Sequence, residues 1–180
     1  MNNIQIIPAT LSDYPIIQNL ARFYVYDRSG FMGWGCEADG MFECIDFKHY
    51  FENPEEKAFL IKVADELAGF VLIDKEYLGP ASHSLKASKH NIGEFFIIAK
   101  FQGTGVASFV AKEVFKMYQG NWSVAIMPKN IKALKFWRKV IGEVSNGNYT
   151  EIAKTADDLK TAENPEAYAM NVFSFEETVQ

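Results

Sequence analysis

The segment that most constrains the fold is a long apolar run followed directly by a glycine loop and an amphipathic stretch. Residues 92–99 are rich in Phe and Ile, which predicts a buried central strand. Residues 106–117 place apolar side chains at helical spacing, and the loop before them carries Gly103 and Gly105. Glycines let a backbone approach a ligand closely, and the N-terminus of a helix attracts anions. The sequence therefore predicts a binding site for a diphosphate at residues 102–107.

Strands and helices alternate along the rest of the chain. Residues 30–55 are predicted to form a loop with one short helix, and residues 79–91 a surface loop. Glycines are expected to end the predicted helices, namely Gly30, Gly120 and Gly142. The other predicted elements are strands at 4–7, 58–63, 67–73, 122–127, 149–154 and 167–175, a helix capped at Ser12-Asp13, and a helix at 131–141. Together they predict one α+β domain over residues 1–180.

Composition and charge exclude several classes of protein. The 180 residues carry 18 basic and 23 acidic side chains, and a net charge of −5 argues against a protein that mainly binds nucleic acid. No apolar run reaches the roughly 20 residues of a membrane helix, and the start at Met1 has no basic or long apolar region of a signal peptide. Cys36 and Cys44 are too few for a disulfide framework or a zinc site, and we expect small buried or half-buried thiols. A cytoplasmic protein without a metal is expected.

Two common phosphate loops fit residues 102–107 poorly. A Walker loop needs Gly-x4-Gly-Lys-Ser/Thr, which the chain does not contain. A dinucleotide-binding loop needs a third glycine where Ser108 stands, and an acidic residue at the end of the next strand, which ends in Ile126-Met127. A purely structural interpretation, in which the glycines only tighten a turn between strand and helix, stays open.

Two motifs in order add a resemblance to a known family. Gln102-x-x-Gly105-x-Ala107 resembles motif A, the (Gln/Arg)-x-x-Gly-x-(Gly/Ala) loop of the GNAT superfamily of N-acetyltransferases. One predicted strand further on, Asn130-x-x-Ala133-x-x-Phe136-Trp137 is similar to the family's Asn-x-x-Ala-x-x-(Leu/Phe)-Tyr segment. The order of the predicted elements agrees with the family from Ile4 to about Phe175.

The resemblance implies a fold and a cofactor site. The fold would be α+β, with a mixed, splayed β-sheet of about six to seven strands flanked by helices and acetyl-CoA between the fourth and fifth strands. Helices within 11–52 would roof the acceptor site, residues 92–141 would form the acetyl-CoA-binding core, and residues 149–175 would close the sheet. The implied cofactor-binding residues are Ile97 and Ile98 through their main chain, motif residue Gln102, the N–H groups of Gly103, Thr104, Gly105, Val106 and Ala107, and the side chains of Asn130 and Phe136.

The implied reaction is direct attack of a neutral primary amine on the thioester of acetyl-CoA. Glu94 is the candidate general base, because it is a lone carboxylate in an otherwise apolar strand and burial raises the pKa of a carboxyl group. The alternative is that Glu94 faces solvent or pairs with a lysine. The N–H groups of Ile97 or Ile98, expected to be unpaired, are the candidate oxyanion donors.

Trp137 departs from the family, because many members carry a tyrosine there that can protonate the departing thiolate. An indole donates a hydrogen bond but gives up no proton at neutral pH. Either Tyr118 or Tyr149 replaces the family's acid, or the thiolate leaves unaided, which a thiol pKa of about 8.5 permits. Trp137 as a simple packing residue of the helix face is the remaining alternative.

The acceptor is the least defined part of the prediction. The segments expected to roof it carry aromatic and acidic side chains, which suit a cationic amine but also an ordinary surface: Tyr24, Tyr26, Asp27, Trp34, Glu37, Asp39, Glu43 and Asp46. Surface positions are expected for His49, His83 and His90, and for a basic run that alternatively meets the 3′-phosphate of CoA: Lys129, Lys132, Lys135, Arg138 and Lys139.

The expected partner is a small molecule or protein that bears an amine. Nucleic acid and membrane are not expected as partners, and a homodimer is left open. Two rival hypotheses are a non-catalytic acyl-CoA-binding module and a nucleotide-binding domain.

Overall fold

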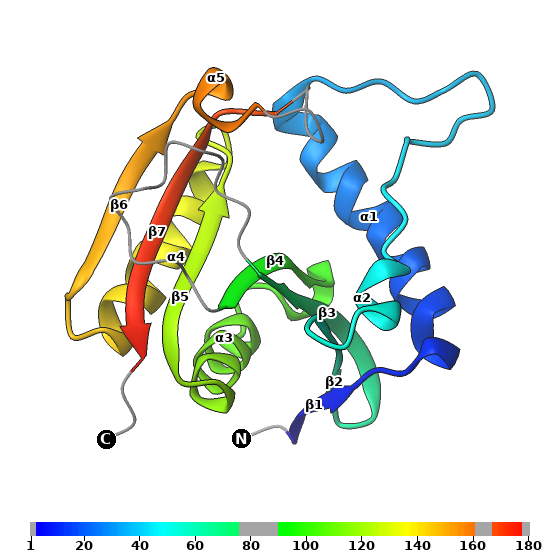
Figure 1. Cartoon of the computed structure of the whole chain (residues 1–180). Coiled ribbons are helices and arrows are strands. Elements are labelled where there is room, and N and C mark those ends of the chain that lie inside the picture. Colours follow the sequence, from blue (N-terminus) through cyan, green and yellow to red (C-terminus); the bar gives the residue numbers. More distant parts are fainter. Residues whose placement is uncertain (1–2, 76–89, 161–166, 178–180) are drawn as a thin grey trace. The chain divides into compact units, whose positions relative to one another are not determined.

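A computed structural model describes residues 3–75, 90–160 and 167–177 (Figure 1). Within these residues seven strands form one sheet: β1 (Ile4–Pro8), β2 (Lys57–Val63), β3 (Glu66–Asp74), β4 (His90–Ile97), β5 (Gly120–Ile126), β6 (Tyr149–Lys154) and β7 (Met170–Glu177). The strand order is β1-β2-β3-β4-β5-β7-β6, and β4 and β5 pair in parallel whereas β1–β2, β2–β3, β5–β7 and β6–β7 pair antiparallel. The predicted α+β fold with a mixed sheet of six to seven strands is confirmed.

The chain divides into two compact units, which are described one at a time. The first comprises Met1–Asp74 and Glu94–Val110, and the second comprises Lys75–Gly93 and Ala111–Gln180. The division passes through β4 and through helix α3 (Val106–Met117), so the loop that joins these two elements lies wholly in the first unit.

The first unit contains a hairpin formed by β2 and β3, which match the strands predicted at 58–63 and 67–73. Its turn is Ala64-Asp65, with φ angles of 50° and 69°. β1 pairs only with β2 and forms the edge of the sheet. This edge position explains why Pro8 is tolerated in the strand, because a proline has no N–H for a second neighbour.

Helix α1 (Tyr14–Met32) begins as predicted but ends later than predicted. Its N-cap residue is Asp13, within the predicted Ser12-Asp13. The short 3₁₀ turn before it (Leu11–Asp13) has its own cap at Thr10, whose N–H and hydroxyl both donate to the Asp13 carboxylate at 2.8 Å each. The helix does not stop at Gly30, because an interior glycine costs only about 1 kcal/mol. It ends at Gly33, whose φ of 79° forms the left-handed cap.

The core of the first unit lies between two helices, α1 and α2, and one face of β2, β3 and β4. Helix α2 (His49–Glu52) is a single turn within the segment predicted to hold one short helix. Side chains from α1, from α2 and the residues before it, and from the three strands pack together there: Ile17, Leu20, Phe47, Tyr50, Leu60, Phe70, Leu72 and Phe96. The rings of Phe70 and Phe96 lie 5.8 Å apart on neighbouring strands.

The backbones of β3 and β4 approach closely at Gly69. A Cβ added to this glycine would lie 2.0 Å from the carbonyl oxygen of Phe96. The neighbouring residue Ala68 accepts a hydrogen bond of 2.8 Å from the N–H of Ile98. Only glycine therefore fits at this point of the hairpin.

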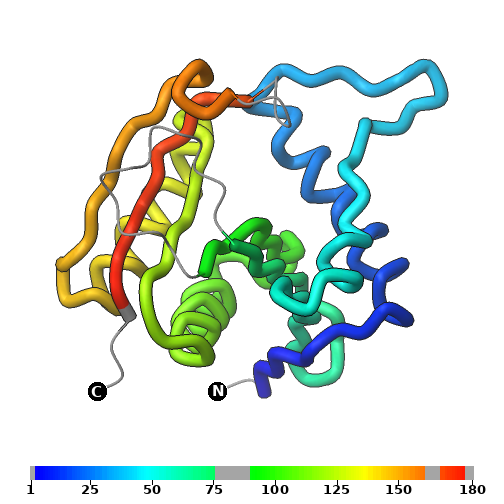
Figure 2. Tube along the Cα trace, viewed as in Figure 1, coloured from blue at the N-terminus to red at the C-terminus, as the bar shows by residue number. Residues whose placement is uncertain are grey.

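The second unit contains β5, β6, β7, helix α4 (Ile131–Val144) and the short helix α5 (Ala156–Leu159). β7 lies between β5 and β6 (Figure 2). The core of the second unit is aromatic. The ring centre of Phe115 in α3 lies 4.9 Å from that of Trp122 in β5 and 4.9 Å from that of Phe175 in β7.

Three further predictions for the second unit are wrong. Gly120 does not close α3 but opens β5, with a φ of 113°. Gly142 does not stop α4, which runs to Val144 and is followed by the buried C-cap residue Ser145. His90 belongs to β4 and not to a surface loop, since its ring stacks on Trp122 at 5.1 Å. The rest of that predicted loop, residues 79–89 with His83, lies outside the described residues.

Candidate active site

The glycine loop after β4 has the backbone needed to approach a ligand. Gly103 and Gly105 have φ angles of 75° and 92°, a region that residues with side chains rarely adopt. Nothing in the described residues lies within 4 Å of the Cβ position that either glycine leaves empty. The carbonyl of Gly105 accepts a 3.0 Å hydrogen bond from the N–H of Phe109. The N–H groups of residues 106–108 therefore lie in the first turn of α3 and precede the N–H of Phe109 along the chain.

Two side chains hold the loop against the end of β4. The Gln102 amide donates to the carbonyl oxygen of Ile97 at 2.8 Å. The Thr104 hydroxyl donates to the carbonyl oxygen of Phe101 at 2.6 Å. These bonds give motif residue Gln102 a positioning role within the protein, which the sequence did not indicate.

The main-chain donors expected on β4 differ from each other. The N–H of Ile98 donates to Ala68 at 2.8 Å, so the expectation that it is unpaired is wrong. The reason is that β3 extends far enough to pair with it. Successive N–H groups of an extended chain point to opposite sides, so the N–H of Ile97 points away from β3. Ile97 stays the candidate oxyanion donor, and no donation by Ile98 is proposed.

Glu94 lies on β4 within a cluster of α1 side chains. Its carboxylate Oε2 is 3.7 Å from Nη1 of Arg28, and the two side chains are 16% and 19% exposed. The Tyr24 hydroxyl hydrogen bonds to Glu94 and accepts a 3.3 Å hydrogen bond from Arg28 Nη1. The Arg28 guanidinium lies 5.1 Å from the ring centre of Tyr24 and 5.5 Å from that of Trp34. The structure favours neither alternative for Glu94, because its side chain is mostly buried and lies beside an arginine rather than a lysine.

Burial sets the protonation behaviour of this cluster. Loss of water raises the pKa of Glu94, and the nearby Asp74 carboxylate raises it further. The Arg28 charge and the Tyr24 hydrogen bond act in the opposite direction. Burial also raises the pKa of Tyr24, which therefore stays a neutral donor. The pKa of Glu94 is thus raised, which is the direction that a general base near neutral pH needs.

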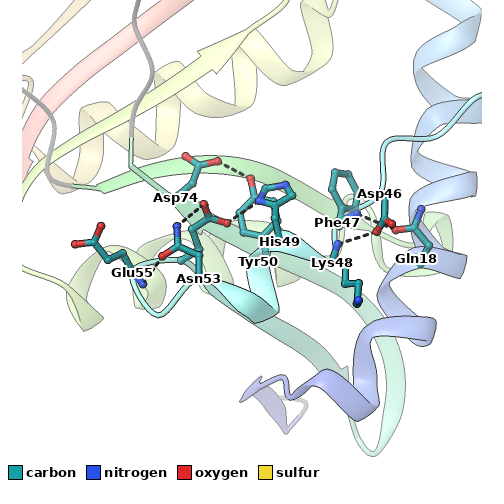
Figure 3. Close-up of polar contacts among 10 residues, drawn as sticks. Gln18, Asp46, Phe47, Lys48, His49, Tyr50, Asn53, Glu55 and Asp74 are labelled. Atoms are coloured by element: carbon teal, nitrogen blue, oxygen red, sulfur yellow. Dashed lines mark hydrogen bonds and ion pairs between the residues drawn. The ribbon is translucent and has the colours of Figure 1, made fainter. Parts of the chain in front are cut away.

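A second polar contact lies beside this cluster, where α2 meets β3 (Figure 3). The hydroxyl of Tyr50 donates to Asp74 Oδ2 at 2.5 Å, and burial raises the pKa of this tyrosine. The ring of His49 stacks on Tyr50 at 4.3 Å, and its Nδ1 lies 2.7 Å from Glu56. The expectation that His49 lies at the surface is confirmed, since its side chain is 52% exposed.

The acceptor lining predicted from the sequence is only partly assembled. Tyr24 and Trp34 lie beside Arg28. Asp46 accepts hydrogen bonds from the Tyr14 hydroxyl and a backbone N–H, both at 2.9 Å, which gives it a structural role. The rest of the set is exposed: Tyr26, Asp27, Glu37, Asp39 and Glu43.

The sequence prediction missed Arg28 and Asp74. Arg28 follows Tyr24 by four residues, so the two share a face of α1, and this spacing was the available signal. Asp74 is the last residue of β3, and no pattern in the sequence connects it to Glu94.

The residues predicted on α4 belong to the second unit. Asn130 caps the helix, since its Oδ1 accepts a 3.0 Å hydrogen bond from the N–H of Ala133. Trp137 is 3% exposed and packs between Phe115 and Phe136, with ring centres at 6.1 and 4.9 Å. These contacts favour the packing role of Trp137. Contacts of Asn130 or Phe136 with a cofactor stay predictions.

The two tyrosines considered as replacement acids also lie in the second unit. Burial raises the pKa of Tyr118, which stacks on His90 at 5.3 Å. Tyr149 packs on Phe173 at 6.1 Å. Within the basic run on α4, Arg138 forms two hydrogen bonds with Glu151, at 2.9 and 2.7 Å. This arginine has a structural partner.

Both cysteines are free thiols. Cys36 is exposed, which corrects the expected burial, whereas Cys44 is half-buried as expected. No group of three or more His, Cys, Asp or Glu side chains within residues 3–75, 90–160 and 167–177 is arranged to hold a metal ion. Among the same residues, every helix is too short or too polar to cross a membrane.

Comparison with known proteins identifies one family and one fold. The sequence profile of the Acetyltransferase (GNAT) family matches residues 20–142. A comparison with curated proteins finds no match. Among solved structures, a GNAT family acetyltransferase from Streptococcus agalactiae has a TM-score of 0.65 at 14% identity, with 99% of each chain covered.

Two other solved structures belong to acetyltransferases whose acceptors are described. An acetyl transferase from Salmonella typhimurium, described as modifying the N-terminal serine of a 50S ribosomal subunit protein, has a TM-score of 0.61 at 13% identity over 97% of this chain and 95% of that one. A chimera of the spermidine N-acetyltransferase SpeG from Vibrio cholerae and hSSAT has a TM-score of 0.58 at 12% identity over 96% of this chain and 95% of that one. At these identities the likeness shows the fold alone.

Proposed function

Because this chain belongs to the GNAT acetyltransferase family, we propose that it transfers the acetyl group of acetyl-CoA to a primary amine, by direct attack within a ternary complex. The observation that carries the proposal is the loop between β4 and α3. Its two glycines have positive φ angles and leave open space beside the N-terminal turn of the helix. When bound, acetyl-CoA supplies the acetyl group as an activated thioester.

The residues of the first unit fit such a ligand. Gly103 and Gly105 leave open space where side chains would stand, beside the N-terminal turn of α3. Backbone N–H groups in that position, together with the helix dipole, favour a diphosphate. The N–H groups of residues 103–107 would hold the diphosphate. Gln102 would fix the position of the loop through its hydrogen bond to the carbonyl oxygen of Ile97.

Glu94 would remove the proton that an amine must lose before it attacks. An alkylamine has a pKa near 10.4 and is almost wholly protonated at pH 7. Burial raises the pKa of Glu94, which makes its carboxylate a stronger base for this proton. The N–H of Ile97, which points away from β3, would stabilise the oxyanion that develops on the carbonyl.

The acceptor class follows from the reaction and from the family. Two proteins of similar fold are described as acting on a polyamine and on the N-terminal serine of a protein. Both acceptors present an amine to the acetyl group. A primary amine is therefore the acceptor class we propose here, on a small molecule or on a protein.

The alternative function is a non-catalytic acyl-CoA-binding module. The observation that favours it is Trp137, which stands where the family carries a tyrosine and is buried among aromatic rings. A chain without an acid for the thiolate still binds the cofactor through its main-chain donors.

One experiment separates the two functions. Release of free CoA is measured with acetyl-CoA and a panel of alkylamines, polyamines, aminoglycosides and peptides with free N-termini, beside calorimetric titration with acetyl-CoA alone. Turnover that depends on one acceptor class supports the enzyme. Tight binding of acetyl-CoA with no turnover across the panel would favour the binding module, and binding of ATP or NAD in its place would reject both.

A further inference from the structure

Arg28 is a half-buried cation that faces the proposed base. It comes from α1, whereas Glu94 comes from β4, so their contact joins the helical layer of the first unit to its sheet. At 3.7 Å the pair is longer than the 2.7–2.9 Å typical of a direct charge-assisted hydrogen bond. A cation at this distance influences the carboxylate through its charge without occupying the close position next to it.

Two aromatic rings and a hydroxyl fix the position of the guanidinium. Its carbon lies 5.1 Å from the ring centre of Tyr24 and 5.5 Å from that of Trp34, and each ring attracts a cation. Nη1 also donates to the Tyr24 hydroxyl at 3.3 Å. Since Tyr24 hydrogen bonds to Glu94 as well, the arginine and the carboxylate share one neighbour. The charge of Arg28 is therefore held near Glu94 by contacts that do not involve the carboxylate.

We propose that Arg28 is the positioning residue of this site: its charge keeps Glu94 ionised in its buried position, so that Glu94 is able to accept a proton at neutral pH. This inference rests on the proposed function of Glu94. Without a counter-ion, a buried carboxylic acid next to a second carboxylate remains protonated and cannot act as a base. Arg28 itself takes no part in the proton transfer.

The other groups that face Glu94 do not replace this charge. Asp74 from β3 is a carboxylate and favours the protonated form of Glu94. Tyr24 from α1 and Tyr50 from α2 are neutral hydroxyls, because burial raises the pKa of both. Burial likewise raises the pKa of the Cys44 thiol in the loop before α2, so it carries no charge at pH 7. Arg28 is the cation that acts on Glu94 among these neighbours.

The test compares three variants of α1. Arg28→Met removes the charge and keeps an aliphatic side chain against Tyr24 and Trp34. Arg28→Lys keeps the charge and loses the planar guanidinium. Arg22→Gln is the matched control, since Arg22 is exposed on the same helix and its removal changes the net charge equally.

Two readouts are measured on each variant. The first is the titration of the Glu94 carboxyl by NMR with ¹³C-labelled glutamate, assigned by the signal lost in Glu94→Gln. It requires neither acetyl-CoA nor an acceptor. The second is the pH profile of kcat/KM with the best amine of the acceptor panel.

We expect the Glu94 titration of Arg28→Met to move to higher pH, and kcat/KM at pH 7 to fall by about tenfold or more, as for the loss of an opposite charge at this range. At high pH, where Glu94 is ionised even without Arg28, kcat/KM of Arg28→Met should come within about threefold of the wild-type value. Arg28→Lys should retain most of the wild-type titration, and Arg22→Gln should match the wild type.

The two readouts keep the inference separate from the proposed function. An unmoved Glu94 titration in folded Arg28→Met overturns the inference. A shifted titration in Arg28→Lys equal to that of Arg28→Met also overturns it, because charge would then not be the cause. A shifted titration in Arg28→Met with an unchanged pH–rate profile supports the role of Arg28 and rejects Glu94 as the base. If Arg28→Met does not fold, the titration of Arg28→Lys decides alone, since it must stay near that of the wild type.

Discussion

Glu94 shows how a single residue acquires a chemical role from its surroundings. In sequence it is one carboxylate in an apolar strand. In the structure it is mostly buried and has Arg28, Tyr24 and Asp74 as neighbours. Burial raises its pKa and Arg28 opposes the rise, so the balance of two effects decides whether the group titrates where an amine-acetylating enzyme needs it.

Replacing Glu94 with glutamine tests the base directly. The wild-type kcat/KM profile should rise with pH as Glu94 loses its proton, at a pKa above the ordinary glutamate value of about 4.3. Glu94→Gln should remove this limb and lower the rate by about 10²–10⁴. Binding of acetyl-CoA, measured by calorimetry, should stay normal in the variant. A near-normal rate with the same profile would leave a water relay as the better account.

Trp137 is expected to contribute packing rather than chemistry, because its ring is buried between Phe115 and Phe136. Trp137→Phe should keep kcat within about threefold, and should lower the free energy of unfolding by about 1–3 kcal/mol for the lost contacts. Steady-state kinetics and urea unfolding measure the two effects. A hundredfold loss of kcat with normal acetyl-CoA binding would instead assign the indole N–H to the thiolate or the carbonyl.

At the scale of elements, the junction of β4, the glycine loop and α3 is where we propose that acetyl-CoA binds. The loop is fixed by Gln102 and Thr104, and its two glycines adopt conformations that side chains disfavour. A strand, a loop and a helix that meet in this way hold several backbone N–H donors in fixed positions near one point.

Gly105→Val tests this junction. Valine is strained at a φ of 92° and adds bulk where the backbone should approach the ligand, so the Kd for acetyl-CoA should rise at least tenfold, about 1.4 kcal/mol. Gly147→Val is the matched control, because Gly147 is exposed, has a φ of 81° and lies in the turn before β6. It should lose similar stability and bind acetyl-CoA normally. Unchanged affinity in folded Gly105→Val would remove the motif A assignment.

The β3–β4 pair makes a prediction about stability alone. Gly69→Ala forces a methyl group to within 2.0 Å of the Phe96 carbonyl oxygen, and the two strands must move apart. Overpacking of this kind costs about 1–3 kcal/mol.

Urea unfolding of Gly69→Ala should show this loss. The control is Gly142→Ala inside α4, where the new methyl group would meet only Tyr149 at 3.8 Å. That variant should gain up to about 1 kcal/mol from helix propensity. Equal stability of the two variants would contradict the close approach at Gly69.

At the scale of the whole molecule, two kinds of carboxylate determine how stability depends on pH. Hydrogen bonds lower the pKa of Asp13, Asp158 and Glu151, the last mainly through Arg138. A lowered pKa means that the folded protein binds protons more weakly than the unfolded chain, so these groups stabilise the fold above about pH 4 and lose this effect as the pH falls through their folded pKa values. Glu94 has a raised pKa and acts in the opposite direction.

Urea unfolding between pH 7 and pH 3 measures both contributions. Wild-type stability should fall below about pH 4, and Glu151→Gln should be less stable at pH 7 by at most about 1 kcal/mol and should approach the wild type at pH 3. Glu94→Gln should differ from the wild type least below about pH 4, and should gain relative stability as the pH rises through the folded pKa of Glu94. Parallel curves for the two variants would show that these carboxylates do not titrate as described.

The sequence by itself determined the local parts of this protein. Periodicity of apolar residues gave each strand and the two central helices, because burial of one face follows from spacing along the chain. Residues 102–107 could be predicted to form a loop between a strand and a helix, because the glycines, the strand before them and the helix after them are neighbours in sequence. The cap of α4 is equally local, since Asn130 accepts from the N–H of Ala133, three residues along the chain.

Only the tertiary structure decided what depends on contacts between distant segments. α1 continues past Gly30 to Met32, and α4 continues past Gly142 to Val144, since one interior glycine costs a helix only about 1 kcal/mol. The N–H of Ile98 is paired because Ala68, thirty residues earlier, lies opposite it. Arg28 and Asp74 reach Glu94 from a helix and from a neighbouring strand, and no local pattern records that meeting. The charge environment of the proposed base is therefore a property of the fold, because electrostatic effects depend on distance in space and on burial.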